Sequence, residues 1–167
     1  MGIPVLPPYT WIRYTRALHM THEETETAKT GPLPQFYADR FGWHGLVAEV
    51  ARIYDSLSPA DRAKAGIFCN NYGEAGAIDL FGPKYGLPPA ISGHQNYFYW
   101  GPRGYSGDLL IVIGESKSDM LRYCDSVQQV GQVDDPLAMP SENGPIYLCR
   151  GGKVPLSAYW PYVKNWH

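Results

Sequence analysis

The chain has little of what marks the specialised classes of protein. Only three of its 167 residues are cysteines, and no two of them have the CxxC spacing of a zinc site. No apolar run approaches the roughly 18 residues of a membrane span. The N-terminus also lacks the basic region and apolar core of a signal peptide. The sequence therefore favours an ordinary globular domain, for which we expect neither a metal nor a cofactor.

Positive charge is also scarce. The 14 lysines and arginines are outnumbered by 16 acidic residues, which gives a formal net charge of −2, and they form no basic stripe. Because nucleic-acid binding needs positive charge to neutralise phosphates, we expect no nucleic-acid partner. Cys69, Cys124 and Cys149 are expected to be buried reduced thiols. The alternative is that Cys69 and Cys149, which both fall on expected strands, are neighbours.

Turn-forming residues and large rings are abundant instead. The chain has 15 prolines and 18 glycines, which indicate many loops and turns. It also has 13 tyrosines and 5 tryptophans, more amphipathic rings than a core of this size requires. Such rings favour surfaces that meet sugars, membranes or protein partners.

Residues 65–100 organise the rest of the chain. The apolar run at 65–69 is typical of a buried strand. A polar turn follows, and residues 74–81 then have helical spacing. Gly82 and Pro83 are expected to end that helix, because proline cannot continue it.

Two loops of this stretch form the expected binding surface. The next strand is predicted at 89–92. In open α/β sheets, ligands bind at the carboxyl ends of the strands. The loops at 70–74 and 93–104 leave two such ends, and both are rich in groups that can hold a ligand.

Apolar periodicity outlines the remaining elements. Residues 37–57 have the spacing of an amphipathic helix, and Ser58 is a suitable N-cap for a second one. Short helices are expected near Ser118 and after Pro155. Further strands are expected at 108–114, 127–133 and 145–150. Helices that alternate with strands predict an α/β fold: a single three-layer domain with a mostly parallel central sheet of about five strands and helices on both faces.

The predicted division of the chain falls after residue 36. Residues 1–36 are expected to form an extended N-terminal arm, because prolines restrict its backbone, although residues 11–20 suit a short helix or strand. This arm either wraps on the domain or is a tether from an upstream segment. Residues 37–167 form the α/β domain.

The loop after the first strand has two interpretations. Asn71 stands where the dinucleotide fingerprint requires its first glycine, and no Walker lysine is present. Glu74 already complements the helix dipole, so a phosphate there would meet a negative charge. Asn71 is therefore a turn residue, or Asn71, Tyr72 and Glu74 together hold a polar ligand.

The aromatic loop at 94–100 is the better binding candidate. It combines an imidazole, amides and several rings, which offer a sugar both hydrogen bonds and an apolar face. The alternative is a loop whose rings pack back onto the sheet. Arg103 is placed either to meet an anionic group or to pair with Asp108. The candidate ligand-binding residues of the two loops are Asn71, Tyr72, Glu74, His94, Asn96, Tyr97, Trp100 and Arg103.

Catalytic signatures are weak. Glu74 and Asp79 are five residues apart on a helix and do not share a face. No GxSxG elbow or HExxH motif occurs, and a serine close to a histidine in sequence is not a triad. A self-contained enzyme would have to use Glu74 and His94 as acid and base. A third hypothesis is a protein-interaction domain that presents exposed tyrosines.

Several motifs, in order, resemble a known family. The segments LPQFYADRFGW, NYGEAGAI, GLPPAISGH and WGP occur at 33–43, 71–78, 86–94 and 100–102, with weaker matches at 140–143 and 147–150. They resemble the soluble C-terminal portion of bacterial membrane glycosyltransferases in the dolichyl-phosphate-mannose–protein mannosyltransferase superfamily (glycosyltransferase family thirty-nine).

The resemblance implies a topology and a role but no catalytic residue. Members of this family span the membrane many times and take a sugar from a polyprenyl-phosphate donor on the extracytoplasmic side. Their catalytic acidic residue lies in an early loop between membrane helices. The chain then corresponds to an excised, non-catalytic periplasmic domain that recognises or positions a sugar, acceptor or lipid headgroup. Its expected partners are the membrane-embedded remainder of the polypeptide and a glycan, acceptor or polyprenyl-phosphate headgroup.

Overall fold

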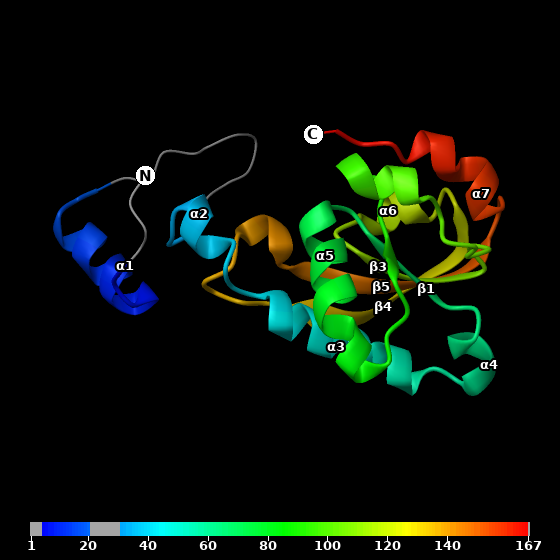
Figure 1. Ribbon diagram of the computed structural model, residues 1–167, viewed down its shortest axis with the longest axis horizontal. Coiled ribbons are helices and arrows are strands. Elements are labelled where there is room, and N and C mark those ends of the chain that lie inside the picture. Colours follow the sequence, from blue (N-terminus) through cyan, green and yellow to red (C-terminus); the bar gives the residue numbers. More distant parts are fainter. Residues whose placement is uncertain (1–4, 21–30, 167) are drawn as a thin grey trace. The chain divides into compact units, whose positions relative to one another are not determined.

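The computed structural model describes residues 5–20 and 31–166, which form two compact units (Figure 1). The first unit comprises Met1–Gly42 and Asp134–Asn143, and the second comprises Trp43–Val133 and Gly144–His167. No helix in the described ranges is long and apolar enough to cross a membrane. The second unit holds the whole sheet and every candidate ligand-binding residue.

The first unit is partly helical. It contains α1 (Pro8–Ala17), α2 (Gln35–Ala38) and the short 3₁₀ helix η3 (Pro140–Glu142). The Tyr37 hydroxyl donates a 2.5 Å hydrogen bond to the Leu6 carbonyl. The arm is therefore not extended throughout, because α1 occupies its middle. The rest of the expected loop before Pro34 lies largely at 21–30, outside the described residues.

The long helix expected over 37–57 is divided. α3 (Trp43–Ser56) begins only after a turn that separates it from α2. Gly42 has a φ of +88°, a left-handed conformation that interrupts a helix and that glycine adopts at low cost. Within α3 the predicted periodicity is confirmed, because Leu46, Val50 and Ile53 are buried along one face.

The sheet has five strands but is mixed. The strands are β1 (Gly66–Cys69), β2 (Ala90–Ile91), β3 (Leu109–Ile113), β4 (Cys124–Val133) and β5 (Gly144–Gly152). Their order is β2-β1-β3-β5-β4. β1 pairs in parallel with β2 and β3, whereas β5 is antiparallel to both β3 and β4. A mixed α/β fold with one five-stranded sheet is confirmed, but the expectation of a mostly parallel sheet is wrong.

The connections between the strands explain why the sheet contains both parallel and antiparallel pairs. A parallel return needs a crossover of about a dozen residues, usually a helix. α5 (Tyr72–Phe81) and the 3₁₀ helix η1 (Gly82–Tyr85) supply one between β1 and β2. The chain between β4 and β5 contains only η3 and returns antiparallel. Apolar strands buried on both faces look alike in either direction, so the sequence does not reveal this difference.

One face of the sheet is covered by α3 and α5 (Figure 1). α4 (Pro59–Arg62) follows α3, and the Ser58 side chain accepts a 3.1 Å hydrogen bond from the Asp61 N–H, which confirms Ser58 as an N-cap. The core on this face includes Leu46, Val50, Ile67, Ile78, Ile111 and Ile146. α5 ends at Phe81 with Gly82 as its C-cap, as expected, and the chain then continues as η1, whose C-cap Gly86 has the left-handed conformation.

The other face is covered by short segments only. These are α6 (Lys117–Met120), α7 (Leu156–Tyr159) and the 3₁₀ helix η4 (Trp160–Tyr162). Their core contains Ile91, Leu110, Val112, Met120, Leu156 and Trp160. The N-cap of α6 is Ser116 rather than Ser118. Because these segments are short, they leave part of this face uncovered by helix.

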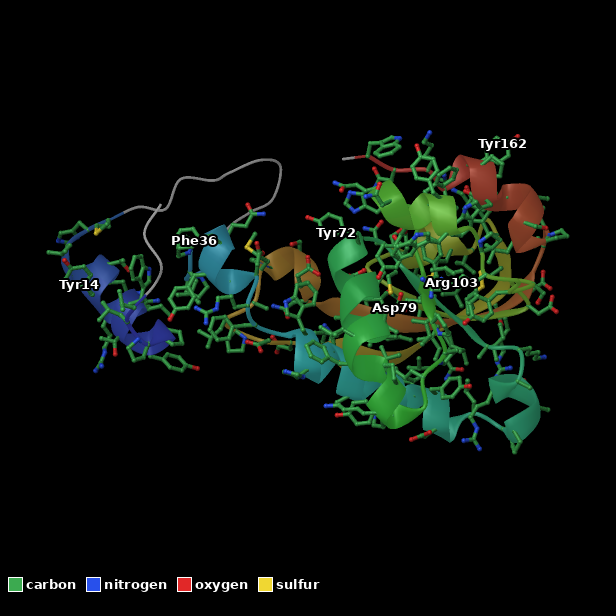
Figure 2. The ribbon with its side chains drawn as sticks, viewed as in Figure 1. Tyr14, Phe36, Tyr72, Asp79, Arg103 and Tyr162 are labelled. Carbon is green, nitrogen blue, oxygen red and sulfur yellow. A yellow bond between two sulfur atoms is a disulfide. The ribbon has the colours of Figure 1, made fainter. Side chains whose placement is uncertain are left out.

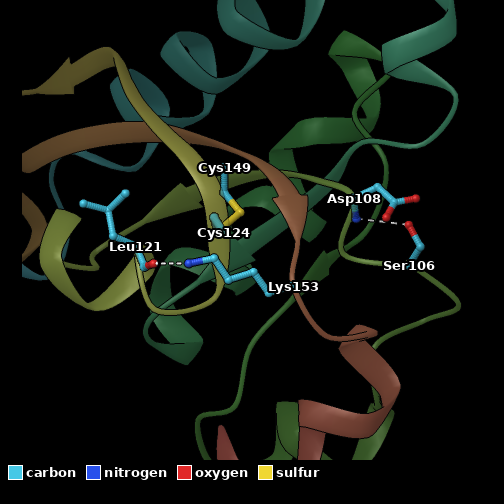
Figure 3. The surroundings of a disulfide bond; sticks show 6 residues. All are labelled: Ser106, Asp108, Leu121, Cys124, Cys149 and Lys153. Carbon is cyan, nitrogen blue, oxygen red and sulfur yellow. Dashed lines mark hydrogen bonds between the residues drawn. A yellow bond between two sulfur atoms is a disulfide. The ribbon is translucent and has the colours of Figure 1, made fainter.

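A disulfide joins β4 to β5 (Figure 3). Cys124 and Cys149 are bonded, with their Cα atoms 5.7 Å apart. Cys69 is the one cysteine outside this bond, and it is buried on the opposite face of the sheet. The expectation of three reduced thiols is therefore wrong, as is the suggested proximity of Cys69 and Cys149. The pairing depends on the antiparallel register of β4 and β5, which the sequence does not show.

Candidate functional site

Asp79 connects the elements of one candidate site. It lies on α5, and its carboxylate accepts hydrogen bonds from the Arg103 guanidinium at 3.0 Å and from the Tyr97 hydroxyl at 3.2 Å. It also accepts a 2.8 Å bond from the backbone N–H of Ala90 in β2. Figure 2 labels Asp79 and Arg103. One carboxylate thus holds a helix, a strand and the aromatic loop together.

Trp100 is presented to solvent by this group. It ends the 3₁₀ helix η2 (Gln95–Trp100) and is 55% exposed. Its ring centroid lies 4.4 Å from that of Tyr97, and the Arg103 guanidinium lies over the ring, 5.3 Å from the centroid. We call Asp79, Tyr97, Trp100 and Arg103 the Trp100 platform. Its rings are held in place before any ligand arrives.

Burial and Asp79 affect the chemistry of the platform. Burial of Tyr97, followed by the neighbouring Asp79 carboxylate, raises the pKa of its hydroxyl to about 12. Tyr97 therefore remains a neutral hydrogen-bond donor at physiological pH. Arg103 pairs with Asp79 rather than with Asp108, the partner that the sequence suggested.

The N-terminus of α5 uses two candidate residues for capping. The Asn71 side chain accepts a 2.9 Å hydrogen bond from the Glu74 N–H, and the Glu74 carboxylate accepts one from the Asn71 N–H at 3.3 Å. This reciprocal arrangement is a capping box. Glu74 is only 1% exposed. Both side chains therefore have a structural role at the start of the helix.

His94 and Tyr72 bring the two loops together. The His94 Nδ1 accepts a 3.3 Å hydrogen bond from the Tyr72 N–H, and the two rings lie 5.0 Å apart between centroids. Burial lowers the pKa of His94. Its Nε2 is buried and has no hydrogen-bond partner among the described residues. Neither imidazole nitrogen bonds to Glu74, so the acid–base pair required by the enzyme hypothesis is not formed here.

The remaining candidate residues lie at the surface. Tyr72 is 52% exposed beside the His94 ring, and Asn96 is exposed on η2. The eight sequence-predicted residues therefore separate into three groups: the platform residues Tyr97, Trp100 and Arg103; the α5 N-terminus with Asn71, Tyr72, Glu74 and His94; and Asn96 alone.

The C-terminal segment adds a second aromatic cluster. The Lys164 ammonium lies over the rings of Phe98, Tyr99 and Trp166, at 5.3, 5.8 and 5.1 Å from their centroids. The segment is tied to the loop by backbone hydrogen bonds between Asn165 and the residues Gly93 and Gln95, both of 2.9 Å. Sequence reasoning missed this cluster because it joins positions more than sixty residues apart.

A cavity of about 340 Å³ lies on the sheet face that α6 and α7 cover. Its walls are mainly apolar, and Asn70 and Glu115, which follow β1 and β3, also line it. None of the eight predicted residues lines it, although Gly93 does. Within the described ranges, no cluster of three or more His, Cys, Asp or Glu side chains could hold a metal ion.

Comparison with protein-family models, curated proteins and solved structures returns no match for this chain.

Proposed function

We propose that the second unit is a non-catalytic recognition domain of a membrane glycosyltransferase that uses a polyprenyl-phosphate sugar. In this proposal the Trp100 platform holds a sugar, either on the donor or on the acceptor. The reaction takes place elsewhere in the same polypeptide, and the domain contributes by positioning its ligand.

The exposed and immobilised Trp100 ring is the observation that carries the proposal. A sugar ring packs an apolar face on an aromatic ring, while its hydroxyls need hydrogen-bonding groups at the edge. Trp100 offers an exposed ring; the Arg103 guanidinium covers one face of it and carries further N–H donors, so a sugar would pack on the other face. Because Tyr97 and Arg103 are both held by Asp79, little side-chain entropy remains to be lost on binding.

The disulfide supports the proposed extracytoplasmic location. Disulfides persist in oxidising compartments such as the periplasm and are rare in the cytosol. The Cys124–Cys149 bond fits the periplasmic side of a bacterial membrane, where the resemblance of the sequence motifs also locates such a domain. The membrane-embedded remainder of the polypeptide is the partner that this location requires.

The absence of a paired acid and base favours recognition over catalysis at these loops. Glu74 is buried in the capping box and His94 bonds to a backbone N–H, so neither is arranged for proton transfer to a ligand.

Ligand-observed NMR of the intact chain tests the proposal. The probes are monosaccharides, short glycans and soluble analogues of a polyprenyl-phosphate headgroup. We expect at least one sugar-bearing probe to show saturation transfer, and Trp100→Ala to reduce its affinity about tenfold or more. Truncation of an aromatic residue at the centre of a contact typically costs this much or more.

Tyr14→Ala is the matched control, because Tyr14 is an exposed ring in the first unit. It should leave sugar binding unchanged. Because the Trp100 ring is more than half exposed, we expect Trp100→Ala to fold normally. Circular dichroism checks this. If no sugar binds to the folded wild-type protein, or if Trp100→Ala binds as well as the wild type, the proposed recognition role is wrong.

A further inference from the structure

The cavity on the α6 and α7 face is separate from the Trp100 platform. Its volume of about 340 Å³ lies at the lower end of the range for small-molecule sites, roughly 300–1,000 Å³. Phe68, Leu110 and Val112 from the sheet and Leu156 from α7 form apolar walls. Such walls suit the apolar body of a small organic molecule.

One end of this cavity is polar. Asn70 directly follows β1, and Glu115 follows β3 after Gly114. The two strands are parallel neighbours, and the Asn70 N–H donates a 3.1 Å hydrogen bond to the Ile113 carbonyl. The cavity thus reaches the carboxyl ends of two adjacent parallel strands, the usual position of a ligand in an open α/β sheet.

Glu115 is a half-buried carboxyl group at this end. Among the described residues, its side chain forms no hydrogen bond or ion pair. Burial, and then the nearby Asp119 carboxylate, raise the pKa of Glu115. Both effects disfavour the ionised form of the Glu115 carboxylate. A cation beside Glu115 would lower the pKa of this carboxyl group and favour its ionised form.

The other charged groups at the cavity are already engaged. Asp119 accepts a 2.6 Å hydrogen bond from the Ser116 hydroxyl and lies 3.6 Å from the Arg122 guanidinium. The Lys164 ammonium lies over the rings of Phe98, Tyr99 and Trp166. Glu115 is therefore the charged group of the cavity that is left for a ligand.

Three tyrosines also line the cavity. Tyr123, Tyr159 and Tyr162 all line the cavity, with centroids 4.2 Å apart for the first pair and 5.9 Å for the second. The Glu115 carboxylate is close enough to raise the pKa of Tyr159, after the larger effects of burial and of the hydrogen bond with Tyr123. Tyrosine rings attract cations through their faces, and their hydroxyl oxygens accept hydrogen bonds.

We propose that this cavity binds a small organic ammonium ion, with the ammonium group at Glu115 and the tyrosines and the apolar body between the sheet and α7. The occupant is a primary amine with a hydrocarbon or aromatic body. A molecule of about a dozen heavy atoms suits a cavity whose volume is near the lower end of the range for small-molecule sites. This site is independent of the sugar site, since it shares no residue with the Trp100 platform.

Three probes with the same phenylbutyl body test the proposal: 4-phenylbutylamine, 4-phenylbutanol and 5-phenylpentanoate. They carry a cationic, a neutral and an anionic head group respectively. Titration calorimetry of the intact chain at neutral pH should show the amine binding about tenfold more tightly than the alcohol, the usual contribution of a charged hydrogen bond. The anion should bind more weakly than the alcohol.

Glu115→Gln should remove the preference for the amine while the alcohol binds as before. Asp55→Asn is the matched control, because it deletes the same charge from an exposed position on α3, which covers the opposite face of the sheet. It should leave the tenfold preference intact. An equal preference for the amine in Glu115→Gln would contradict the assignment of Glu115.

Methionine methyl NMR on the wild-type chain keeps the test independent of the folding of any variant. Met120 lines the cavity, whereas Met139 lies in the core of the first unit. The amine should shift the Met120 methyl signal and leave that of Met139 unchanged. Absence of binding by all three probes at millimolar concentration, tighter binding of the anion, or a shift at Met139 without one at Met120 would overturn the proposal.

Discussion

The Asp79 carboxylate and the Arg103 guanidinium lie 3.0 Å apart although 24 residues separate them. Each side chain is about a quarter exposed, so water screens this ion pair and it contributes little by itself. The backbone N–H of Ala90 and the Tyr97 hydroxyl also depend on the same carboxylate. Asp79 is consequently more important to the platform than the ion pair alone suggests.

Asp79→Ala should lower the free energy of unfolding by about 2 kcal/mol. The reason is that the N–H of the fully buried Ala90 loses its acceptor, a loss that costs about 1–3 kcal/mol. Arg103→Ala removes only the screened ion pair and should cost less than about 1 kcal/mol. Urea denaturation compares the two. Equal losses would show that Asp79 acts through Arg103 alone.

Alkaline pH should weaken the folded state through Tyr97. Its pKa is about 12 in the folded protein, against about 10 for an ordinary tyrosine. Between these values the unfolded chain releases the proton first, so the folded state binds more protons and the free energy of unfolding falls as pH rises. Below that window Tyr97 has no such effect.

Tyr97→Phe should therefore make the decline in stability above pH ~10 less steep. Urea denaturation of both proteins over this pH range measures the difference. Tyr14→Phe, at an exposed position in the first unit, is the control and should retain the wild-type slope. If Tyr97→Phe and the wild type decline in parallel, the high pKa of Tyr97 is wrong.

Two glycine substitutions should change stability in opposite directions. A methyl group on Gly93 would overlap the Val163 carbonyl of the C-terminal segment, a backbone atom that cannot move away easily. Gly93→Ala should therefore cost about 2 kcal/mol or more. Gly45, in α3, has nothing within 4 Å of an added methyl group.

Gly45→Ala should raise the free energy of unfolding by about 0.5–1 kcal/mol, because alanine is the better helix former. Thermal denaturation of both variants provides the measurement. A neutral Gly93→Ala would mean that the C-terminal segment does not pack against Gly93 as described.

Reduction of the disulfide should destabilise the protein by about 2–4 kcal/mol, the usual range for a loop of this length. The bonded cysteines are 25 residues apart in sequence. Urea denaturation with and without a phosphine reductant should show the loss in the wild type and in Cys69→Ala. Cys124→Ser/Cys149→Ser should not respond to the reductant. Titration of the denatured, unreduced protein that finds three thiols instead of one would contradict the disulfide.

Much of the fold is predictable from local pattern. Apolar runs locate β1 and β3, periodicity locates α3, and Ser58 is recognisable as a cap. These signals depend on neighbouring residues only. The direction of β5 cannot be predicted from neighbouring residues, because a buried strand has the same composition in a parallel or an antiparallel pair.

The candidate site is predictable only in part, for the same reason. Tyr97 and Trp100 are conspicuous in the sequence as rings within a polar loop. Their anchor, Asp79, is an unremarkable helix residue until the fold brings it to Arg103. The Cys124–Cys149 bond and the position of Glu115 in the cavity depend on strand register and on burial, which no short motif encodes.

The indole N–H signals of the tryptophans offer the most direct test of the proposed sugar site. In ¹⁵N-labelled protein, titration with the best sugar probe should shift the signal of Trp100, identified with Trp100→Phe. The signal of Trp160 should stay unchanged, because its indole is buried and donates a 2.9 Å hydrogen bond to the Phe98 carbonyl. A sugar that binds without moving the Trp100 signal would contradict the platform as its recognition site.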